Sequence, residues 1–171
     1  SDLRRQRQMC IRDRFQQFYD PNALGCPANT TGLYWSALQM FERGYMLWRS
    51  DSDAAYAIYG NLQGSWFEIP ERWDGSTVAP RGEPPSTNLV APERGFGYVW
   101  GIRDDIYENL GWATDTEKGF CALIQPFDQG FILQSIPVDS CTAENLFNQA
   151  RSADWRPITL IASANGQFTI R

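Results

Sequence analysis

The stretch Phe41-Glu42-Arg43-Gly44-Tyr45-Met46-Leu47-Trp48 decides the fold, because a close copy follows later as Phe127-Asp128-Gln129-Gly130-Phe131-Ile132-Leu133. A Leu-Gly pair precedes each copy, at Leu24-Gly25 and Leu110-Gly111, and 16 residues separate its glycine from the phenylalanine in both cases. A spacing kept in two places indicates a tandem repeat, whose copies bury their apolar faces against a neighbour. We therefore interpret Gly25, Gly44, Gly111 and Gly130 as structural turn residues.

Alternation of apolar and polar residues around these motifs predicts strands. We expect them at 35–41, 45–48, 56–60 and 65–69 in the first copy and at 121–127, 130–134, 158–162 and 167–170 in the second. Glu42-Arg43-Gly44 suits a three-residue hairpin turn closed by a left-handed glycine. The predicted fold class is mainly β: two four-stranded antiparallel meander repeats, blade- or sandwich-like, with short helical connectors.

The offsets between the copies set the domain boundaries. Gly44 and Gly130 are 86 residues apart and Gly64 and Gly166 are 102 apart, so the second copy carries a 16-residue insertion, with a short helix expected at 142–150. We assign 15–73 to the first β repeat and 110–171 to the second. Between them, 74–109 begins as a Pro- and Gly-rich extended connector and ends in one or two helical turns.

Residues 4–14, RRQRQMCIRDR, resemble the in-frame translation of a transposase sequencing adapter. We therefore interpret residues 1–14 as an artefact of cloning or assembly and exclude them from fold reasoning, so a signal peptide upstream would not be visible. The alternative is a basic N-terminal arm that binds nucleic acid or membrane. Taking five Arg and two Asp from the 15 basic and 20 acidic residues leaves 10 and 18, a formal net charge of −8.

Charge and composition narrow the function classes. An acidic chain whose single lysine is Lys118 is a poor ligand for polyphosphate, which disfavours nucleic acid and anionic lipid. The apolar runs are too short to cross a bilayer, so no membrane insertion is expected. The chain has no histidine, which excludes imidazole-based catalysis and His-ligated zinc from these residues. We expect no enzyme activity, no metal and no cofactor.

Three motifs carry a resemblance to known repeats. Two are the Leu-Gly openings LGCP and LGWA, each followed at fixed spacing by F-[ED]-x-G-[YF]-[MI]-L. The third is ERGFGYVW at 93–100. They resemble repeats of secreted or surface-exposed proteins of Chloroflexota-type bacteria and, more distantly, LGFP repeats of actinobacterial cell-envelope proteins. The likeness covers 23–69 and 92–134. It implies an extracellular repeat module that accompanies other domains of a parent chain. The second copy departs from the pattern at Ala113 and Gln134.

Several polar residues have a structural and a functional interpretation. Glu42 and Asp128 occupy equivalent turn positions and provide the two carboxylates that glycoside hydrolysis needs, but a solvated turn favours such residues anyway. Asp104-Asp105 and Asp51 with Asp53 lack the spacing of a known calcium loop. Gln39 and Gln125, identical at corresponding positions, are expected to tie a neighbouring strand or loop through their amides. A ligand contact is the second interpretation for both glutamines.

Aromatic residues give the best functional lead, because flat rings with polar edges stack on sugars. Most must be core. We nominate Trp48 for a ligand-binding surface, since Gln134 stands at its place in the second copy and a core position would have stayed apolar in both. Trp73 at the edge of the connector is its partner, and Trp66 is a weaker candidate because its counterpart Phe168 suggests packing.

Three cysteines remain outside the adapter-like stretch. In the second hairpin Cys121 should lie across from about Ile136, five residues before Cys141. A disulfide between Cys121 and Cys141 would join the insertion to the sheet if the protein is secreted. Cys26 would then remain free or buried.

The function that these observations favour is a non-catalytic extracellular module that binds cell-envelope polysaccharide. A second class is a structural or protein-interaction spacer of a larger surface protein, whose aromatics would all be buried. A third is a hydrolase with two carboxylates facing one cleft.

Overall fold

A computed structural model describes residues 13–138, 140–150 and 157–171. Most of the stretch attributed to an adapter, residues 1–12, lies outside the described residues. The elements are α2 (Asp13–Gln16), α3 (Pro21–Leu24), β1 (Gly32–Phe41), β2 (Gly44–Arg49), β3 (Ala54–Gly60), β4 (Gln63–Ile69), α4 (Arg94–Ile102), α5 (Asp104–Leu110), β5 (Lys118–Phe127), β6 (Gly130–Ile136), α6 (Ala143–Ala150), β7 (Thr159–Ser163) and β8 (Gln167–Ile170).

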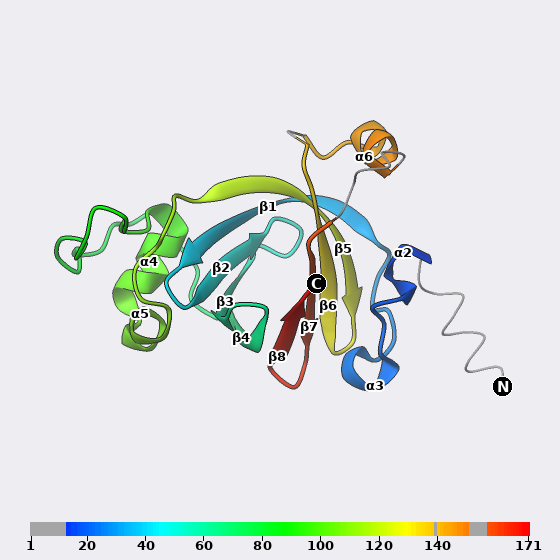
Figure 1. The fold of residues 1–171 in the computed structure, drawn as a ribbon, viewed down its shortest axis with the longest axis horizontal. Coiled ribbons are helices and arrows are strands. Elements are labelled where there is room, and N and C mark those ends of the chain that lie inside the picture. Colours follow the sequence, from blue (N-terminus) through cyan, green and yellow to red (C-terminus); the bar gives the residue numbers. More distant parts are fainter. Residues whose placement is uncertain (1–12, 139, 151–156) are drawn as a thin grey trace. The chain divides into compact units, whose positions relative to one another are not determined.

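The protein is mainly β, as the sequence predicts. Eight antiparallel strands follow one another in the hydrogen-bonded order β1-β2-β3-β4-β8-β7-β6-β5, and this one sheet closes into a barrel (Figure 1). The expected arrangement of separate blade- or sandwich-like sheets is therefore wrong. Periodicity within a strand shows which residues share a face, but it carries no information on how the outer strands of two meanders pair.

All eight expected strands are present, and most extend one to three residues beyond the expected bounds. The turn type differs from the expectation. Phe41 pairs with Gly44 and Phe127 with Gly130, so each hairpin turns through two residues and its glycine is the first residue of the next strand. A glycine just after such a turn looks the same in the sequence whether it closes a three-residue turn or opens the strand.

The chain divides into two compact units whose boundaries differ from those of the two sequence repeats. One is continuous, Ser36–Gly119, and holds most of the first meander, the connector, α4 and α5. The other combines the described residues of Ser1–Trp35 with Phe120–Arg171. Each unit therefore contains a meander from one copy and the Leu-Gly turn that opens the other.

Backbone hydrogen bonds explain why the units differ from the repeats, because each Leu-Gly turn docks on a hairpin turn of the other copy. In the continuous unit Glu42 N donates to Trp112 O at 3.0 Å and Arg43 N to Leu110 O at 3.0 Å. In the second unit Asp128 N donates to Cys26 O at 2.8 Å and Gln129 N to Leu24 O at 2.9 Å. The corresponding residues are again 86 apart, so the repeat extends to the docking contact itself.

Two glutamines extend the same contact. Gln39 Nε2 donates to Asp115 O at 3.0 Å, and Gln125 Nε2 donates to Asn29 O at 2.9 Å. Each buried amide therefore ties the loop that follows a Leu-Gly turn to the strand beside it. Gln125 Oε1 also accepts from the Thr31 hydroxyl, whereas Gln39 Oε1 is buried without a hydrogen-bond partner among the described residues.

Apolar residues on one face of each meander form the core of its unit. In the continuous unit Met46 and Ala57 pack with Phe96, Val99 and Leu110 of α4 and α5, and Figure 1 shows these two helices together beside the β1–β4 meander. In the other unit Leu123, Ile132 and Ile161 pack with Phe15 and Leu24.

We expect Gly130→Ala to destabilise the protein by about 3 kcal/mol. Gly130 has φ 130°, and a Cβ there would lie 1.9 Å from Ala162 O, a backbone atom that cannot move away. Gly75→Ala is the matched control, because Gly75 has φ 89° and nothing lies within 4 Å of its Cβ position. Urea unfolding should show a loss of about 1 kcal/mol for the control. Equal losses in both variants would contradict the packing argument.

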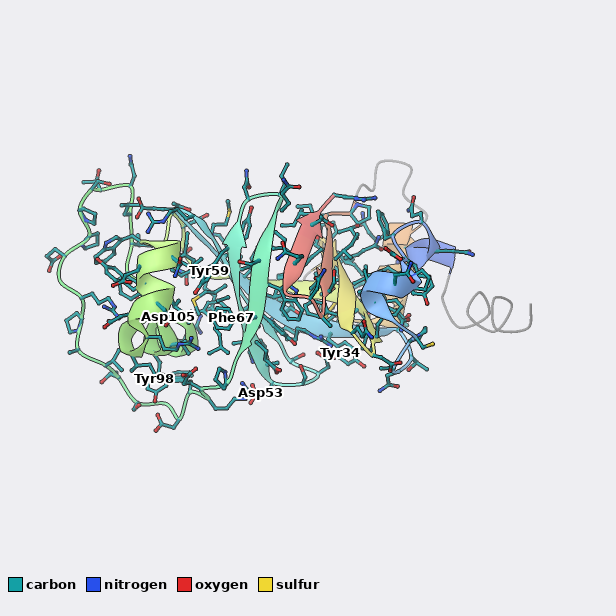
Figure 2. All side chains as sticks on the ribbon, turned by 90° about the horizontal axis from the view of Figure 1, so that it is seen from below. Tyr34, Asp53, Tyr59, Phe67, Tyr98 and Asp105 are labelled. Atoms are coloured by element: carbon teal, nitrogen blue, oxygen red, sulfur yellow. A yellow bond between two sulfur atoms is a disulfide. The ribbon has the colours of Figure 1, made fainter. Side chains whose placement is uncertain are left out.

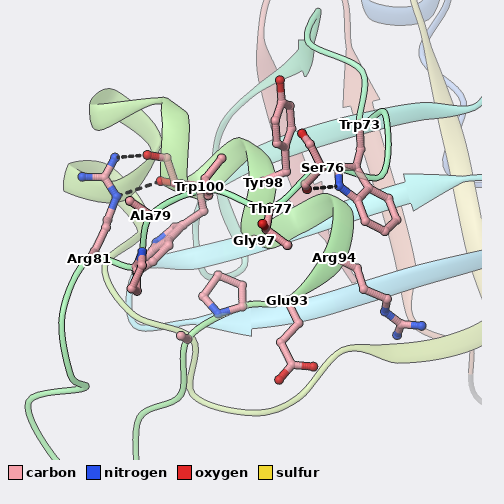
Figure 3. Close-up of a pocket in the computed structure, with 15 residues that line it drawn as sticks. Trp73, Ser76, Thr77, Ala79, Arg81, Glu93, Arg94, Gly97, Tyr98 and Trp100 are labelled. Carbon is pink, nitrogen blue, oxygen red and sulfur yellow. Dashed lines mark hydrogen bonds between the residues drawn. The ribbon is translucent and has the colours of Figure 1, made fainter.

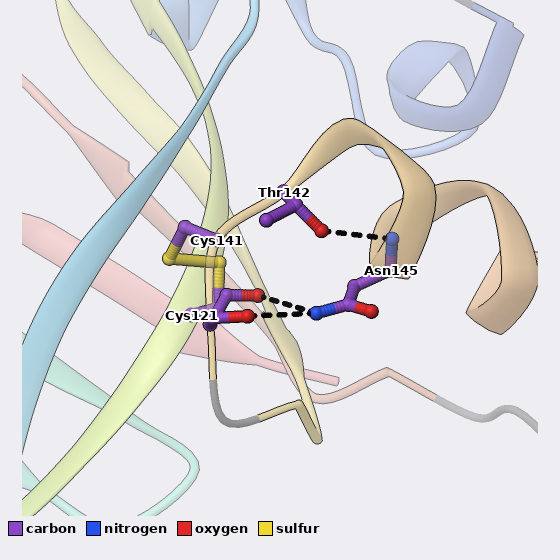
Figure 4. Close-up of a disulfide and its surroundings, with 5 residues drawn as sticks. Cys121, Cys141, Thr142 and Asn145 are labelled. Carbon is purple, nitrogen blue, oxygen red and sulfur yellow. Dashed lines mark hydrogen bonds between the residues drawn. A yellow bond between two sulfur atoms is a disulfide. The ribbon is translucent and has the colours of Figure 1, made fainter.

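The insertion of the second copy is tied down by a disulfide between Cys121 and Cys141, whose Cα atoms are 5.4 Å apart. Cys121 faces Ile136 across the hairpin, in the register that the sequence predicts. Figure 4 shows the bond beside the start of α6, where Asn145 N donates to Thr142 Oγ1 at 3.1 Å. Cys26 is free and exposed.

Reduction of the disulfide should lower the free energy of unfolding by about 3 kcal/mol, because the bond closes a loop with a sequence separation of 20 residues. Peptide mapping without reductant should find Cys121 linked to Cys141, and an alkylating reagent should modify Cys26 in the native protein. Alkylation of both Cys121 and Cys141 before reduction would contradict the pairing.

Candidate functional site

A groove of about 330 Å³ lies in the continuous unit between the connector and α4. It is lined by Trp73, Ser76, Thr77, Val78, Ala79, Pro80, Arg81, Ala91, Pro92, Glu93, Arg94, Gly97, Tyr98, Trp100 and Gly101 (Figure 3). All of them come from two adjacent segments, 73–81 and 91–101, so the groove belongs to a single compact unit.

The sequence of α4 explains why one of its sides is open. Phe96, Val99 and Trp100, at helical spacing, are buried and face the core. The opposite side carries Gly97 and Gly101, which leave room for the connector to approach. A Cβ at Gly101 would lie 2.3 Å from Val78 Cγ2, so only a glycine allows this contact. Helix and connector therefore enclose a groove with a floor of small residues.

Trp73 forms one wall and is 44% exposed. Its ring lies against Gly95, with ring carbon Cε3 3.6 Å from the position that a Cβ would take. Its indole nitrogen donates to Ser76 O at 2.8 Å, and Ser76 N donates to Asp74 Oδ1 at 2.9 Å. Hydrogen bonds from Ser76 hold the pKa of Asp74 below its ordinary value, so this carboxylate stays charged. The ring is thus fixed in orientation while a large part of its surface stays open.

Arg81 anchors the far end of the connector. Its guanidinium donates to Trp100 O at 2.9 Å and Gly101 O at 3.2 Å, and it forms an ion pair with Asp104 at 2.8 Å. The same group lies 4.4 Å from the centroid of the Tyr107 ring. It therefore satisfies carbonyls at the end of α4, where a cation is favourable. Since its donors are committed to the protein, Arg81 holds the groove in shape.

Polar groups at the start of α4 remain available to a ligand. Glu93 is the N-cap residue of the helix, makes no side-chain capping bond, and has no hydrogen-bond or ion-pair partner for its carboxylate among the described residues. Arg94 is exposed and pairs with Glu117 at 2.8 Å. The hydroxyl of Tyr98, which borders the same groove, has no hydrogen-bond partner within the described ranges.

An indole face with a carboxylate, a guanidinium and hydroxyls around it is the chemistry that sugar recognition uses, because C–H faces stack on the ring and hydroxyls bind its edge. Glu93 is the one carboxylate among the lining residues. General acid/base hydrolysis of a glycoside needs two. The arrangement therefore suits binding better than cleavage.

Trp48, nominated with Trp73, does not border this groove. Met46, on the same face of β2, is fully buried, and Trp48 is half-buried against the same core cluster. Its indole nitrogen donates to Asp53 Oδ1 at 2.9 Å. Among the described residues Trp48 and Trp73 make no ring contact with each other. The face of β2 that carries Met46 and Trp48, which was expected to be exposed, is covered by α4 and α5. The alternation of apolar and polar residues in the meander does not show which face a helix will cover.

Trp66 is also half-buried, and its ring centroid lies 5.6 Å from that of Tyr56. The two carboxylates of the hairpin turns, Glu42 and Asp128, belong to different units. Glu42 Oε1 accepts from Trp112 N at 2.9 Å and so supports the docked turn, while Asp128 is an exposed residue of the other unit. These contacts support the structural role in hairpin turns that was expected for Glu42 and Asp128.

The acidic pairs considered for calcium have other partners. Asp51 pairs with Arg49 at 2.6 Å, and Asp105 pairs with Arg103 at 2.6 Å. Within the described part of the chain no group of three or more His, Cys, Asp or Glu side chains could hold a metal ion.

Sequence reasoning missed Glu93, Arg94 and Tyr98. In the sequence their segment shows only the resemblance at 93–100 and the apolar spacing of a short helix. The spacing of Arg94, Gly97, Tyr98 and Gly101 at intervals of three and four residues was a usable signal, because it marks a second helix face with two glycines.

Arg103, between α4 and α5, joins the helices to the end of the first meander. It pairs with Glu71 at 3.3 Å and lies 5.0 Å from the centroid of the Phe67 ring.

Figure 2 shows Phe67 and Tyr59 close to Asp105 of α5. The hydroxyl of Tyr59 is buried there without a hydrogen-bond partner in the described structure. Burial, with the nearby Asp105 charge, raises the pKa of Tyr59 to about 12.

Stability should therefore fall as pH rises from 10.0 to about 12. Below this window both folded and unfolded Tyr59 keep the proton and the residue contributes nothing. Within it the unfolded chain ionises first, which favours unfolding. Tyr59→Phe should remove this part of the pH dependence and, at neutral pH, leave stability unchanged or higher by about 1 kcal/mol. Denaturation at a series of pH values measures both effects, and an unchanged slope in Tyr59→Phe would exclude the assignment.

No family model, no curated protein and no solved structure matches this chain. The resemblance to LGFP-type repeats therefore stays a hypothesis.

Across the described residues, no helix is long and apolar enough to span a membrane.

Proposed function

We propose that this chain is a non-catalytic carbohydrate-binding module of the cell exterior, and that cell-wall or surface polysaccharide binds in the groove between the connector and α4. The observation that carries the proposal is Trp73, an indole held by its own hydrogen bond and still 44% exposed in a groove with polar edges. A fixed ring loses little conformational freedom when a sugar stacks on it.

Three features support this function. The groove of about 330 Å³ falls at the lower end of small-ligand sites, which suits one or two sugar rings at the end of a glycan. Its single carboxylate favours binding over the hydrolase alternative. The Cys121–Cys141 disulfide fits an oxidising compartment, since such bonds are rare in the cytosol. Other domains of a parent chain would provide further contacts to the same polysaccharide.

A structural or protein-interaction spacer is the second candidate. The packing of several tryptophans favours it, since Trp100 and Trp112 are buried and Trp48 and Trp66 are half-buried. The two candidates differ in what Trp73 does. In a spacer Trp73 would only close the connector against Gly95, whereas in a binding module its open surface contacts the ligand.

Trp73→Ala should weaken glycan binding about fivefold with little effect on stability, because the residue is exposed and one stacked ring contributes about 1 kcal/mol to a weak, sub-millimolar ligand. Trp35→Ala is the matched control, since Trp35 is 41% exposed but lies outside the groove. Isothermal titration calorimetry with soluble glycans of neutral, acidic and amino type measures the effect.

Trp48→Ala provides a second control, because it should lower stability by about 3 kcal/mol through loss of core packing. Absence of heat with every class of glycan in the folded wild-type protein would exclude the binding module and favour the spacer. Equal loss of binding in Trp35→Ala and Trp73→Ala would exclude this groove as the site.

A further inference from the structure

We infer that the groove selects sugars that carry a free, protonated amino group, such as glucosamine residues of a deacetylated glycan. This inference rests on the proposed function and names the ligand class for the same site. It depends on which charges around the groove are already neutralised by the protein.

Both cations of the groove have partners within the protein. Arg81 pairs with Asp104 at 2.8 Å and also donates to two carbonyls at the end of α4. Arg94 pairs with Glu117 at 2.8 Å. A carboxylate, sulfate or phosphate on a ligand would have to compete with these existing pairs. The groove is therefore poorly suited to acidic polysaccharide.

Glu93 is the one charged lining residue whose side chain has no ion-pair or hydrogen-bond partner among the described residues. Asp74, adjacent to Trp73 in the chain, adds a second negative charge that is hydrogen-bonded to Ser76 and has no cation partner in the described ranges. The charge that the protein leaves unmatched is thus negative. A ligand ammonium would complement it through a charge-assisted hydrogen bond to Glu93.

Aromatic groups favour the same ligand. An ammonium near an indole face is attracted by the quadrupole of the ring, and Trp is the most effective side chain for this interaction. Trp73 and Glu93 both line the groove (Figure 3). A glucosamine ring can therefore stack through its C–H face while its ammonium contacts the carboxylate. N-acetylation would remove the charge and weaken this contact.

The net charge of the whole chain is negative, like the charge of Glu93 and Asp74 at the groove. Its formal net charge is −5, which attracts cationic glycans and repels acidic ones at low ionic strength. This long-range effect is screened by salt, whereas the contact with Glu93 is local. The salt dependence that remains in a Glu93 variant would report the long-range part.

The test compares three oligosaccharides of equal length by isothermal titration calorimetry: fully deacetylated glucosamine, its N-acetylated form, and an uncharged glucose oligomer. The wild-type protein should bind the glucosamine oligomer about threefold to fivefold more tightly than the other two. Glu93→Gln keeps the size of the side chain and should clearly reduce this preference, leaving only the smaller part that comes from Trp73 and the net charge. The preference should also vanish at high pH, where the sugar amine loses its proton.

Glu83→Gln is the matched control, because Glu83 is an exposed carboxylate in the same connector but does not line the groove. It should keep the preference. Equal affinity of wild-type protein for all three oligosaccharides, with loss in Trp73→Ala, would overturn this inference and leave the proposed function intact. An undiminished preference for glucosamine in Glu93→Gln would also overturn it. Absence of binding by any oligosaccharide would overturn both.

Discussion

The docking of a Leu-Gly turn on a hairpin turn is the contact on which the rest of the structure depends. It is made by backbone groups, Glu42 N to Trp112 O and Arg43 N to Leu110 O, and Glu42 Oε1 adds a bond from Trp112 N. Because these donors and acceptors would otherwise be left without partners at the end of a strand and the end of a helix, the contact satisfies both at once. Gly111, at φ 75°, takes a conformation that other residues adopt at a cost.

From this contact the position of the groove follows step by step. The indole nitrogen of Trp100 donates to Gly111 O at 2.9 Å, so the docked turn holds α4 in place. The connector is joined to the same turn, since Val90 N donates to Ala113 O at 2.9 Å. Arg81 then links the connector to the end of α4. A binding site built from an irregular segment thus gains rigidity from a repeat contact, which is what preorganised recognition requires.

The second copy shows the limits of the repeat. It keeps the docked turn, with Gly25 at φ 72°, but Gln134 replaces Trp48 and forms a buried hydrogen bond to Thr159 Oγ1 at 3.1 Å. It also carries the insertion joined by Cys121–Cys141, which lies between β6 and β7 and has no counterpart between β2 and β3. The function that we propose therefore belongs to one unit, while the architecture belongs to both.

The sequence alone determined the strands, the hairpins, the repeat offset of 86 residues and the pairing of Cys121 opposite Ile136, because alternation and turn residues are local. It also indicated Trp73 as an exposed aromatic. Only the tertiary structure decided that the Leu-Gly turn serves the other copy, that one closed sheet replaces two, and that α4 covers the face of Met46 and Trp48. These depend on which surfaces meet between segments far apart in the chain. A single sequence carries no periodic signal for tertiary contacts between distant segments. Glu93 could therefore be recognised as a groove residue only when the structure showed α4 and the connector together.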